Sequence, residues 1–436
     1  MTDKTTKTDA LACARELLRF IAASPTSYQA VDTLSSMLEK AGFHALREQD
    51  AWTLRAGEGY YTQRGGSSLI AFRIPAQRAE GFAITASHSD SPSFKLKYNP
   101  EMERAGGVIG LNVEKYGGML CATWMDRPLS VAGRIAVRSG EGVRTLPVTV
   151  ERDLLLIPSV AIHMNRSAND GASYNPQTDM VPLFSDASGK GALMKIVAEA
   201  AGVAEEDILS SDLFLYNRTP GVIWGPSEEF LSAPRIDNLA CAYATMRGLT
   251  EAESVDRIAL CAVFDNEEVG SSTKQGAAST FLDDTMYRIM TALGGSEEDY
   301  RRAIARSFMI SADNAHAIHP NHPEYGDPVN RPKLNGGIVI KYNASQRYAT
   351  DALSDAIFRL HCGRAGVAVQ TFVNRSDLAG GSTLGSISDT CVSVNTVDIG
   401  LPQLAMHSSY ETAGTADVAD LIALSRDFYT AAIYGD

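Results

Sequence analysis

Two adjacent glutamates, Glu267 and Glu268, lie in the stretch DNEEVGS, which directly follows the apolar run Ile258–Phe264. Such a run is typical of a buried strand, so the two glutamates stand where that strand should end. Adjacent carboxylates repel each other, and burying both is costly unless cations lie nearby. The economical interpretation is a metal site in which one glutamate is a ligand and the other is a general base.

Further candidate ligands lie after predicted strands or at the start of a predicted helix. They are His88 and Asp90 in HSDSP, Asp237 in PRIDN, Asp313 in SADNAH and His407 in AMHSSYE. Binding sites of open α/β sheets form at the carboxyl ends of the strands, so these segments can converge in one crevice.

Two imidazoles and three carboxylates suit a pair of zinc ions, with Mn²⁺ or Co²⁺ as alternative ions. The ions of a two-metal site lie about 3.5–4 Å apart, so one carboxylate must bridge them. We assign the bridge to Asp237. His88 and Asp313 would complete one metal, and Glu268 and His407 would complete the other.

Each of these residues, taken alone, has a structural alternative. Asp237 could be a helix N-cap, and His407 could be a hydrogen-bonded core histidine. Asp90 could form a turn before Pro92, although a carboxylate two residues beyond His88 is also placed to orient its ring. Their joint placement beside a glutamate pair favours the metal site.

Three further histidines, in ADNAHAIHPNHP, are not expected to form a second metal cluster. Pro320 and Pro323 prevent a helical face there, and the ligand set is already filled. His316 is expected to line the pocket, whereas His319 and His322 are expected in a loop.

The elements that position these residues alternate between helix-like and strand-like patterns in residues 1–93, and again from 233 onward. This pattern predicts an α/β fold with a mixed, largely parallel sheet flanked by helices. Residues 94–232 differ, because short strand-like runs such as Leu120–Trp124 are separated by glycine turns. We therefore predict a β-rich domain, 94–232, inserted into an α/β catalytic domain formed by 1–93 and 233–436.

Composition narrows the class of protein. The 436 residues carry a net charge of -13, which argues against non-specific binding to nucleic acid or to an anionic membrane. No stretch approaches the roughly 18 apolar residues of a membrane span. The six cysteines form no CxxC pair, which suits free thiols in a reducing compartment. We expect a soluble cytoplasmic protein.

Six segments resemble, in order and spacing, the aspartyl aminopeptidases, a family of cocatalytic-zinc exopeptidases. They are HSDSP, PRIDN, FDNEEVGS, SADNAHAIHPN, VIKYNASQRYAT and PQLAMHS. The resemblance extends over essentially the whole chain, including TWMDRPLSVAGR and IPSVAIHMNR in the predicted insertion. Six ordered motifs are a specific signal, although each alone would be weak.

The resemblance implies that the insertion is a dimerisation domain and that dimers assemble into dodecamers. It implies metal ligation by His88, Asp237, Glu268, Asp313 and His407, with Glu267 as general base and Asp90 orienting His88. It also implies that His163 enters a neighbouring subunit's active site, and that Lys341, Tyr348 and His316 face the substrate.

Two positions depart from the family pattern. Tyr410 stands where acid-preferring members usually carry an arginine, and Ser89 stands where a threonine is more usual. The metal site is unaffected by these changes, but the substrate preference is put in question.

The expected function is a dinuclear-zinc aminopeptidase that acts on peptides with a free N-terminus and prefers Asp or Glu there. One alternative is a broad-specificity aminopeptidase or a related two-metal amidohydrolase that recognises a carboxylate or an acyl group. The other alternative is a catalytically silent assembly or cargo protein. Hydrolysis of a panel of aminoacyl-anilides, measured with and without a chelator, distinguishes these hypotheses.

Overall fold

The apolar runs of the two outer segments pair into one mixed sheet. In the computed structural model, which describes residues 2–77, 79–253 and 255–431, this sheet has nine strands. Their order is β1 (His44–Leu46), β2 (Gly59–Arg64), β3 (Ser68–Arg73), β13 (Ile258–Phe264), β4 (Phe82–His88), β14 (Phe308–Ala312), β18 (Asn395–Gly400), β16 (Ile338–Tyr342) and β17 (Val369–Val373). The pairs β1–β2, β13–β4, β4–β14, β14–β18 and β16–β17 are parallel. The predicted α/β class, with a largely parallel sheet, is confirmed.

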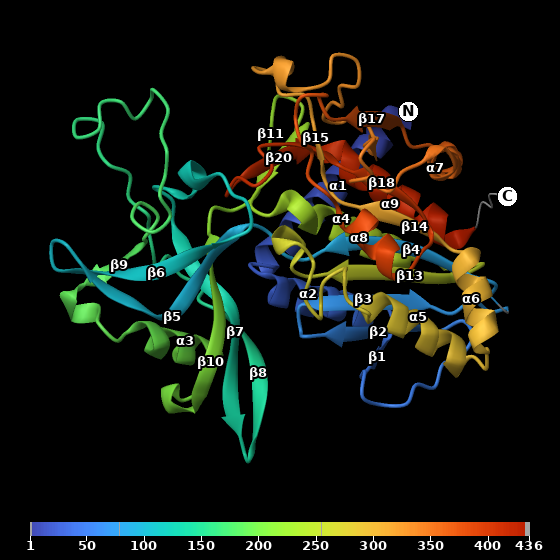
Figure 1. Ribbon diagram of the computed structural model, residues 1–436, viewed down its shortest axis with the longest axis horizontal. Helices are drawn as coiled ribbons and strands as arrows, with labels where there is room; N and C mark the ends of the chain where they lie inside the picture. Colours follow the sequence, from blue (N-terminus) through green and yellow to red (C-terminus); the bar gives the residue numbers. More distant parts are fainter. Residues whose placement is uncertain (1, 78, 254, 432–436) are drawn as a thin grey trace.

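Helices cover both faces of this sheet (Figure 1). One face carries α1 (Thr2–Ala23), α2 (Ser27–Lys40), α4 (Ile236–Glu251), α7 (Ala352–Ala365) and α9 (Thr415–Thr430), and the other carries α5 (Phe281–Ala292), α6 (Glu297–Ala305) and α8 (Leu384–Cys391). Along β13, Cys261 and Val263 pack into the first layer, and Leu260 and Phe264 pack into the second. Successive side chains of a strand point to opposite faces, so a strand covered on both sides is apolar throughout.

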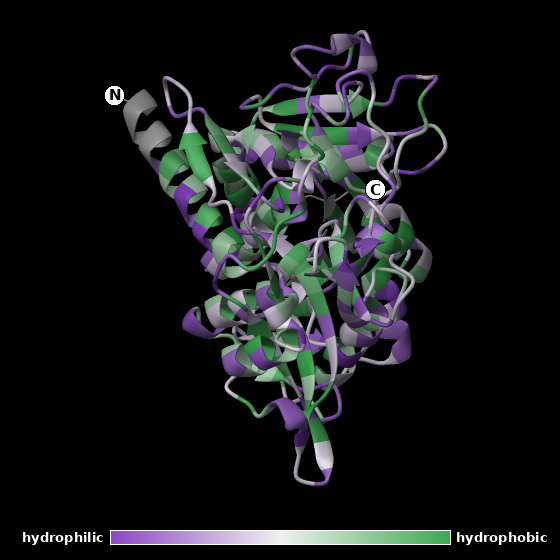
Figure 2. Cartoon of the chain, turned by 90° about the vertical axis from the view of Figure 1, so that its left-hand side faces the viewer, coloured by the Kyte–Doolittle hydropathy of each residue, from purple (hydrophilic) through white to green (hydrophobic). Residues whose placement is uncertain are grey.

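Much of the predicted insertion forms a sheet of its own, at the left of Figure 1. Its order is β8 (Gly142–Thr149), β7 (Leu129–Ser139), β10 (Ile208–Asn217), β5 (Ser93–Arg104), β6 (Val108–Tyr116) and β9 (Leu183–Asp186), and all of its pairs are antiparallel. Helix α3 (Leu193–Ala201) adds Leu193 and Val197 to a separate core around Phe94 and Leu215. Figure 2 views the molecule from this side and shows apolar residues along the strands and mostly polar connecting loops.

A third, five-stranded sheet joins both parts of the sequence. Its order is β11 (Val222–Trp224), β12 (Phe230–Ala233), β20 (Glu411–Gly414), β19 (Pro402–Leu404) and β15 (Ala315–His316). Strands β11 and β12 lie largely within the predicted insertion but belong to a sheet with C-terminal strands. The separate sheet of the insertion therefore ends at Asn217, before the predicted domain boundary at 232. The role of the insertion in dimerisation stays a prediction.

Two further observations complete the fold. Leu120–Trp124, which has a strand-like pattern, is instead largely a 3₁₀ turn, Cys121–Trp124. Within the described ranges, no helix is both long enough and apolar enough to cross a membrane.

Candidate metal centre

Three neighbouring parallel strands deliver the first candidate ligands. Strand β4 pairs in parallel with both β13 and β14, so the carboxyl ends of all three meet at one edge. His88 is the last residue of β4 and lies in register with Phe264, the last residue of β13. Glu268 follows β13 within a few residues, and Asp313 directly follows β14.

The other two ligand candidates come from the opposite side of the cluster. Asp237 lies at the start of α4, where its backbone and that of Asn238 are not helical and the peptide between them is cis. His407 lies in the connection between β19 and β20 and has φ of 66°. The regular turns of α4 begin after Asn238, so Asp237 does lie at a helix start, but its Oδ1 is buried without a hydrogen-bond partner among the described residues rather than bonded to a backbone N–H.

These five residues, which we call the metal cluster, form two overlapping trios. In the first, Nε2 of His88 lies 3.7 Å from Oδ1 of Asp237 and 3.5 Å from Oδ1 of Asp313. In the second, Nε2 of His407 lies 3.5 Å from Oδ2 of Asp237 and 3.4 Å from Oε2 of Glu268. The donor atoms of each trio all lie within 4.8 Å of one another. Asp237 offers one oxygen to each trio, as a bridging ligand must.

The donor set fits cations rather than a hydrogen-bonded core. Oδ1 of Asp237 and Oε1 of Glu268 are buried and have no hydrogen-bond partner among the described residues. Burial, with a smaller contribution from Asp237, raises the pKa of Glu268 well above its ordinary value. Burial and the charges around it raise the pKa of Glu267 to about 8. Bound cations would remove these penalties, and oxygen and imidazole donors suit zinc.

Glu267 also lies close to the metal cluster, although it belongs to neither trio. One of its oxygens falls within 4.8 Å of donor atoms of His88 and Glu268. Distance alone therefore allows Glu267 either to bind a metal or to act on a molecule bound beside it.

Asp90 connects the two strand ends. Nδ1 of His88 lies 3.1 Å from the backbone carbonyl oxygen of Asp90 and 3.3 Å from its Oδ1, so the Nε2 atom of that ring faces the cluster. The same carboxylate accepts the backbone N–H of Glu267 at 3.2 Å and that of Glu268 at 3.1 Å. Asp90 thus holds the His88 ring and the glutamate pair in one arrangement.

Glu411 is a residue of the site that the sequence did not single out. Its carboxylate accepts the backbone N–H of Asp237 at 3.0 Å and that of His407 at 2.8 Å. Burial, and then the charge of Asp237, raises the pKa of Glu411 to about 8. A carboxylate four residues beyond a ligand histidine, at the start of β20, was the available signal.

The three predicted substrate residues lie together beside Asp313. Nζ of Lys341 is 3.5 Å from Oδ2 of Asp313 and 5.5 Å from the ring centre of Tyr348. Burial alone would lower the pKa of Lys341, but the Asp313 carboxylate raises it, so the ammonium stays charged. His316 is exposed, and its ring lies 5.7 Å from that of Phe372.

The structure does not bring His163 to the cluster of its own chain. This exposed residue lies between β8 and β9, in a long loop that Figure 1 shows apart from α4 and β13. It belongs to none of the groups that the described part of the chain offers a metal ion, nor do His319 and His322.

Tyr410 turns away from the cluster. Its hydroxyl donates to the carbonyl of Pro220 at 2.7 Å, and its ring lies 5.8 Å from Cζ of Arg127. These contacts support the loop around His407, and the hydroxyl is satisfied without substrate.

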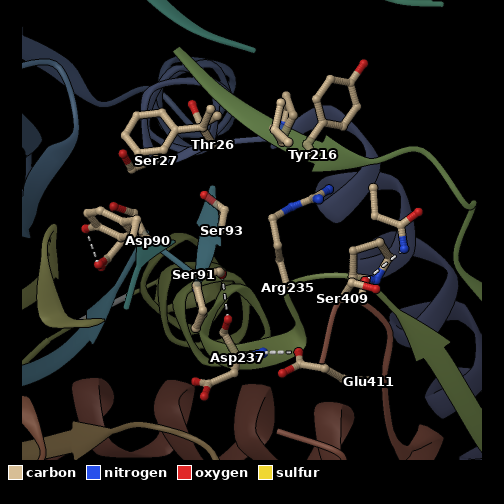
Figure 3. A pocket seen from close by; sticks show the side chains of 18 of the residues that line it. Thr26, Ser27, Asp90, Ser91, Ser93, Tyr216, Arg235, Asp237, Ser409 and Glu411 are labelled. Atoms are coloured by element: carbon tan, nitrogen blue, oxygen red, sulfur yellow. Dashed lines mark hydrogen bonds between the residues drawn. The ribbon is translucent and has the colours of Figure 1, made fainter. Parts of the chain in front are cut away.

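A small polar cavity lies behind the cluster, with Asp90, Asp237, Ser91 and Arg235 among the side chains around it (Figure 3). Its volume of about 50 Å³ leaves room for roughly three to five water molecules. Neither Lys341 nor His316 lines it, so this cavity is separate from the predicted substrate residues.

Residues 20–429 match a family model described as aminopeptidase I zinc metalloprotease (M18). The chain belongs to the M18 family. The resemblance inferred from the six motifs is confirmed, and the M18 chain is a metallo-aminopeptidase of a zinc-dependent family.

Relatives and solved structures agree over nearly the whole M18 chain. It is 44% identical over 425 residues to a probable M18 family aminopeptidase 2 of Clostridium novyi, covering 95% of this chain and 98% of that one. It is 41% identical over 421 residues to a counterpart from Pseudomonas savastanoi, covering 95% and 97%. Its fold matches Ape4 in a complex with Nbr1 (TM-score 0.94, 35% identity, 97% and 86% covered). It also matches the mApe1 dodecamer of S. cerevisiae (TM-score 0.84, 28% identity, 95% and 96% covered).

Proposed function

We propose that this M18 aminopeptidase binds two zinc ions per subunit and releases single N-terminal residues from peptides, with a preference for Asp and Glu. The observation that carries the proposal is the pair of donor trios that share Asp237. Lys341, a buried cation beside one trio, supports the preference for acidic residues.

The chain's own residues can perform the hydrolysis. Zinc bound by the metal cluster would polarise the scissile carbonyl and favour ionisation of the attacking water. Glu267 takes the proton of that water and delivers it to the leaving amine, because one of its oxygens lies at the cluster, within 4.8 Å of donor atoms of His88 and Glu268. Asp90 keeps the His88 ring and the backbone of Glu267 in place during this transfer.

The preference for acidic residues rests on one buried cation. A substrate carboxylate loses its water when it binds, so the pocket must supply a charge or several donors. Lys341 supplies the charge, and Tyr348, which lies beside it, supplies a hydroxyl. Since Tyr410 points to Pro220, no second cation comes from that position, and we expect weaker discrimination than the family resemblance implies.

The test compares Asp-, Glu-, Leu- and Ala-anilides, with and without a chelator, on wild type and Lys341→Met. Chelation should abolish all activity, and zinc, Mn²⁺ or Co²⁺ should restore it. Loss of one charge-assisted contact costs about 1.5–3 kcal/mol, so Lys341→Met should lower kcat/KM for acidic substrates roughly 10- to 150-fold. The Leu-anilide and the zinc content are its controls. If wild type prefers the Leu substrate, the enzyme is a broad-specificity aminopeptidase, and cleavage of N-acylated substrates alone would favour an amidohydrolase.

The assembly follows from the loop that carries His163. Its apolar neighbours Val160, Ile162 and Met164 are 61%, 48% and 84% exposed, which is unfavourable for a monomer. Pairing of two insertions would cover them and carry His163 toward the partner's site. We propose dimers that assemble into a dodecamer like that of the yeast neighbour, with peptides as substrates in the cytoplasm.

A further inference from the structure

The segment 116–120 leads out of β6 of the inserted sheet and reaches the metal cluster. The Tyr116 hydroxyl donates to Oδ2 of Asp90 at 2.6 Å and accepts from Nδ2 of Asn266 at 2.8 Å. Since the amide of Asn266 can only donate through that nitrogen, the phenolic hydrogen must point to Asp90. Burial, and then the charge of Asp90, raises the pKa of Tyr116 far above its ordinary value, which keeps that hydrogen in place.

The inserted sheet holds the Tyr116 ring. Tyr116 pairs with Ser93 in the β5–β6 ladder, and its ring meets Phe214 of β10 edge-on at 5.5 Å. An edge-to-face contact fixes the ring plane and therefore the direction of the hydroxyl. The position of Asp90 thus depends on the position of the inserted sheet.

The following residues touch the other half of the cluster. A Cβ on Gly117, which has φ of +78°, would lie 3.1 Å from Cβ of Glu268, so only glycine allows this approach. A Cβ on Gly118 would lie 4.0 Å from Nδ1 of His407. The backbone N–H of Leu120 donates to the carbonyl of His407 at 3.1 Å.

We infer that the segment 116–120 makes the inserted sheet a part of the metal site, and that Tyr116 is the positioning residue that holds Asp90 and, through it, the His88 ring. The inference rests on the proposed zinc site and adds a dependence of zinc affinity on the inserted sheet. A residue that holds the hydrogen-bond acceptor of a ligand histidine affects the orientation and the basicity of that imidazole.

The test measures zinc affinity of the folded, full-length protein by competition with a chromophoric chelator. Tyr116→Phe removes only the hydroxyl and should weaken zinc binding roughly 10- to 100-fold. Tyr216→Phe is the matched control, because that hydroxyl, also in the inserted sheet, donates at 2.9 Å to the carbonyl of Val150, just after β8, and not to Asp90. The control should bind zinc as wild type does, and circular dichroism should show both variants folded.

A double-mutant cycle shows whether the effect passes through Asp90. Two groups that act on one ligand are not additive, so Tyr116→Phe should cause no further loss of affinity in an Asp90→Asn background. An unchanged affinity in Tyr116→Phe, an equal loss in Tyr216→Phe, or additive losses in the cycle would each overturn the inference while leaving the zinc site intact. Failure of wild type to bind zinc would instead refute the proposed function together with it.

Discussion

Glu267 and Glu268 are neighbours in sequence, yet their surroundings differ. Oε2 of Glu268 lies 3.4 Å from Nε2 of His407, and its Oε1 is buried without a hydrogen-bond partner among the described residues, which suits a metal ligand. Glu267 belongs to neither trio, although one of its oxygens lies within 4.8 Å of donor atoms of His88 and Glu268. The structure thus supports the division of the pair into one ligand and one base, which their sequence positions alone could only suggest.

Replacing each glutamate by glutamine tests this division. Glu267→Gln should keep the zinc content and lower kcat roughly 10²- to 10⁴-fold, the usual contribution of general acid–base catalysis. Glu268→Gln should lose one of the two ions, since an amide is a poorer ligand than a carboxylate. Elemental analysis together with kinetics checks both. Loss of zinc in Glu267→Gln but not in Glu268→Gln would reverse the assignment.

The sequence revealed those site residues that are polar or charged at the end of a predicted apolar strand. His88, Asp313 and the glutamate pair are polar groups directly after apolar runs, so their pattern pointed to a site. Glu411 was not found, because its contacts with two ligand loops arise only when β20 joins the third sheet.

Elements with uninterrupted apolar runs were predicted well. Strand β13 occupies the range of the run Ile258–Phe264, and the runs Phe82–Ala86 and Phe308–Ser311 predict β4 and β14 except at their carboxyl ends. The failures depended on distant partners. Leu120–Trp124 contains apolar and aromatic residues typical of strands, but Trp124 packs against Phe94 from within a 3₁₀ turn. Strand β12 could not be separated from the insertion, because its partner β20 lies far along the chain.

Asp398 of β18 connects two loops that flank the predicted substrate side. This fully buried carboxylate accepts the backbone N–H of Ala349, next to Tyr348, at 2.6 Å and the hydroxyl of Thr383 at 2.7 Å. Asp398→Asn replaces one acceptor with a donor, so the Tyr348 loop should be released. Because hydrogen bonds to charged groups contribute about 1.5–3 kcal/mol, we expect KM to rise roughly tenfold or more with zinc content unchanged.

The matched control for this change is Asp389→Asn. Asp389 lies in α8 and accepts the backbone N–H of Val394 at 3.1 Å, without contact to either loop. Its KM should equal that of wild type. Equal KM values in both variants and wild type would show that Asp398 does not position the Tyr348 loop.

Packing of α7 against α9 gives the protein a pH-dependent stability. His361 is buried, and burial lowers its pKa despite Asp427 at 3.0 Å, whose carboxylate is already paired with Arg364. As the pH falls through about 6.5, the unfolded chain gains a proton at this histidine before the folded one does, so folding stability is lost. Between pH 7.5 and 5.5, wild type should therefore lose more unfolding free energy than His361→Gln. Denaturant titrations check this, and parallel losses in both proteins would contradict it.

At the scale of the whole molecule, the metal cluster lies where the nine-stranded sheet, the third sheet and the inserted sheet meet. The nine-stranded sheet supplies His88 and Asp313, and the third sheet positions the loop of His407. Segment 116–120 comes from the inserted sheet. Sequence patterns predicted that an insertion exists. They did not predict this contact, because a tyrosine at the end of a strand has no distinguishing spacing.

Mixing of inactive subunits tests the shared site proposed for the assembly. His163→Ala should impair activity and keep its zinc, because the loop that carries His163 lies apart from α4 and β13 in Figure 1 and His163 belongs to no ligand group of the described residues. Mixed with Glu267→Gln under conditions of subunit exchange, it should regain part of the wild-type activity through hybrid sites. A fully active monomer in the analytical ultracentrifuge would contradict the shared site.

The central claim is that Asp237 bridges two ions, and anomalous diffraction at the zinc edge tests it most directly. A crystal of the zinc-loaded protein should show two peaks about 3.5–4 Å apart. One peak should lie among His88, Asp237 and Asp313, and the other among Asp237, Glu268 and His407. A single peak, or peaks away from Asp237, would contradict the two-metal account.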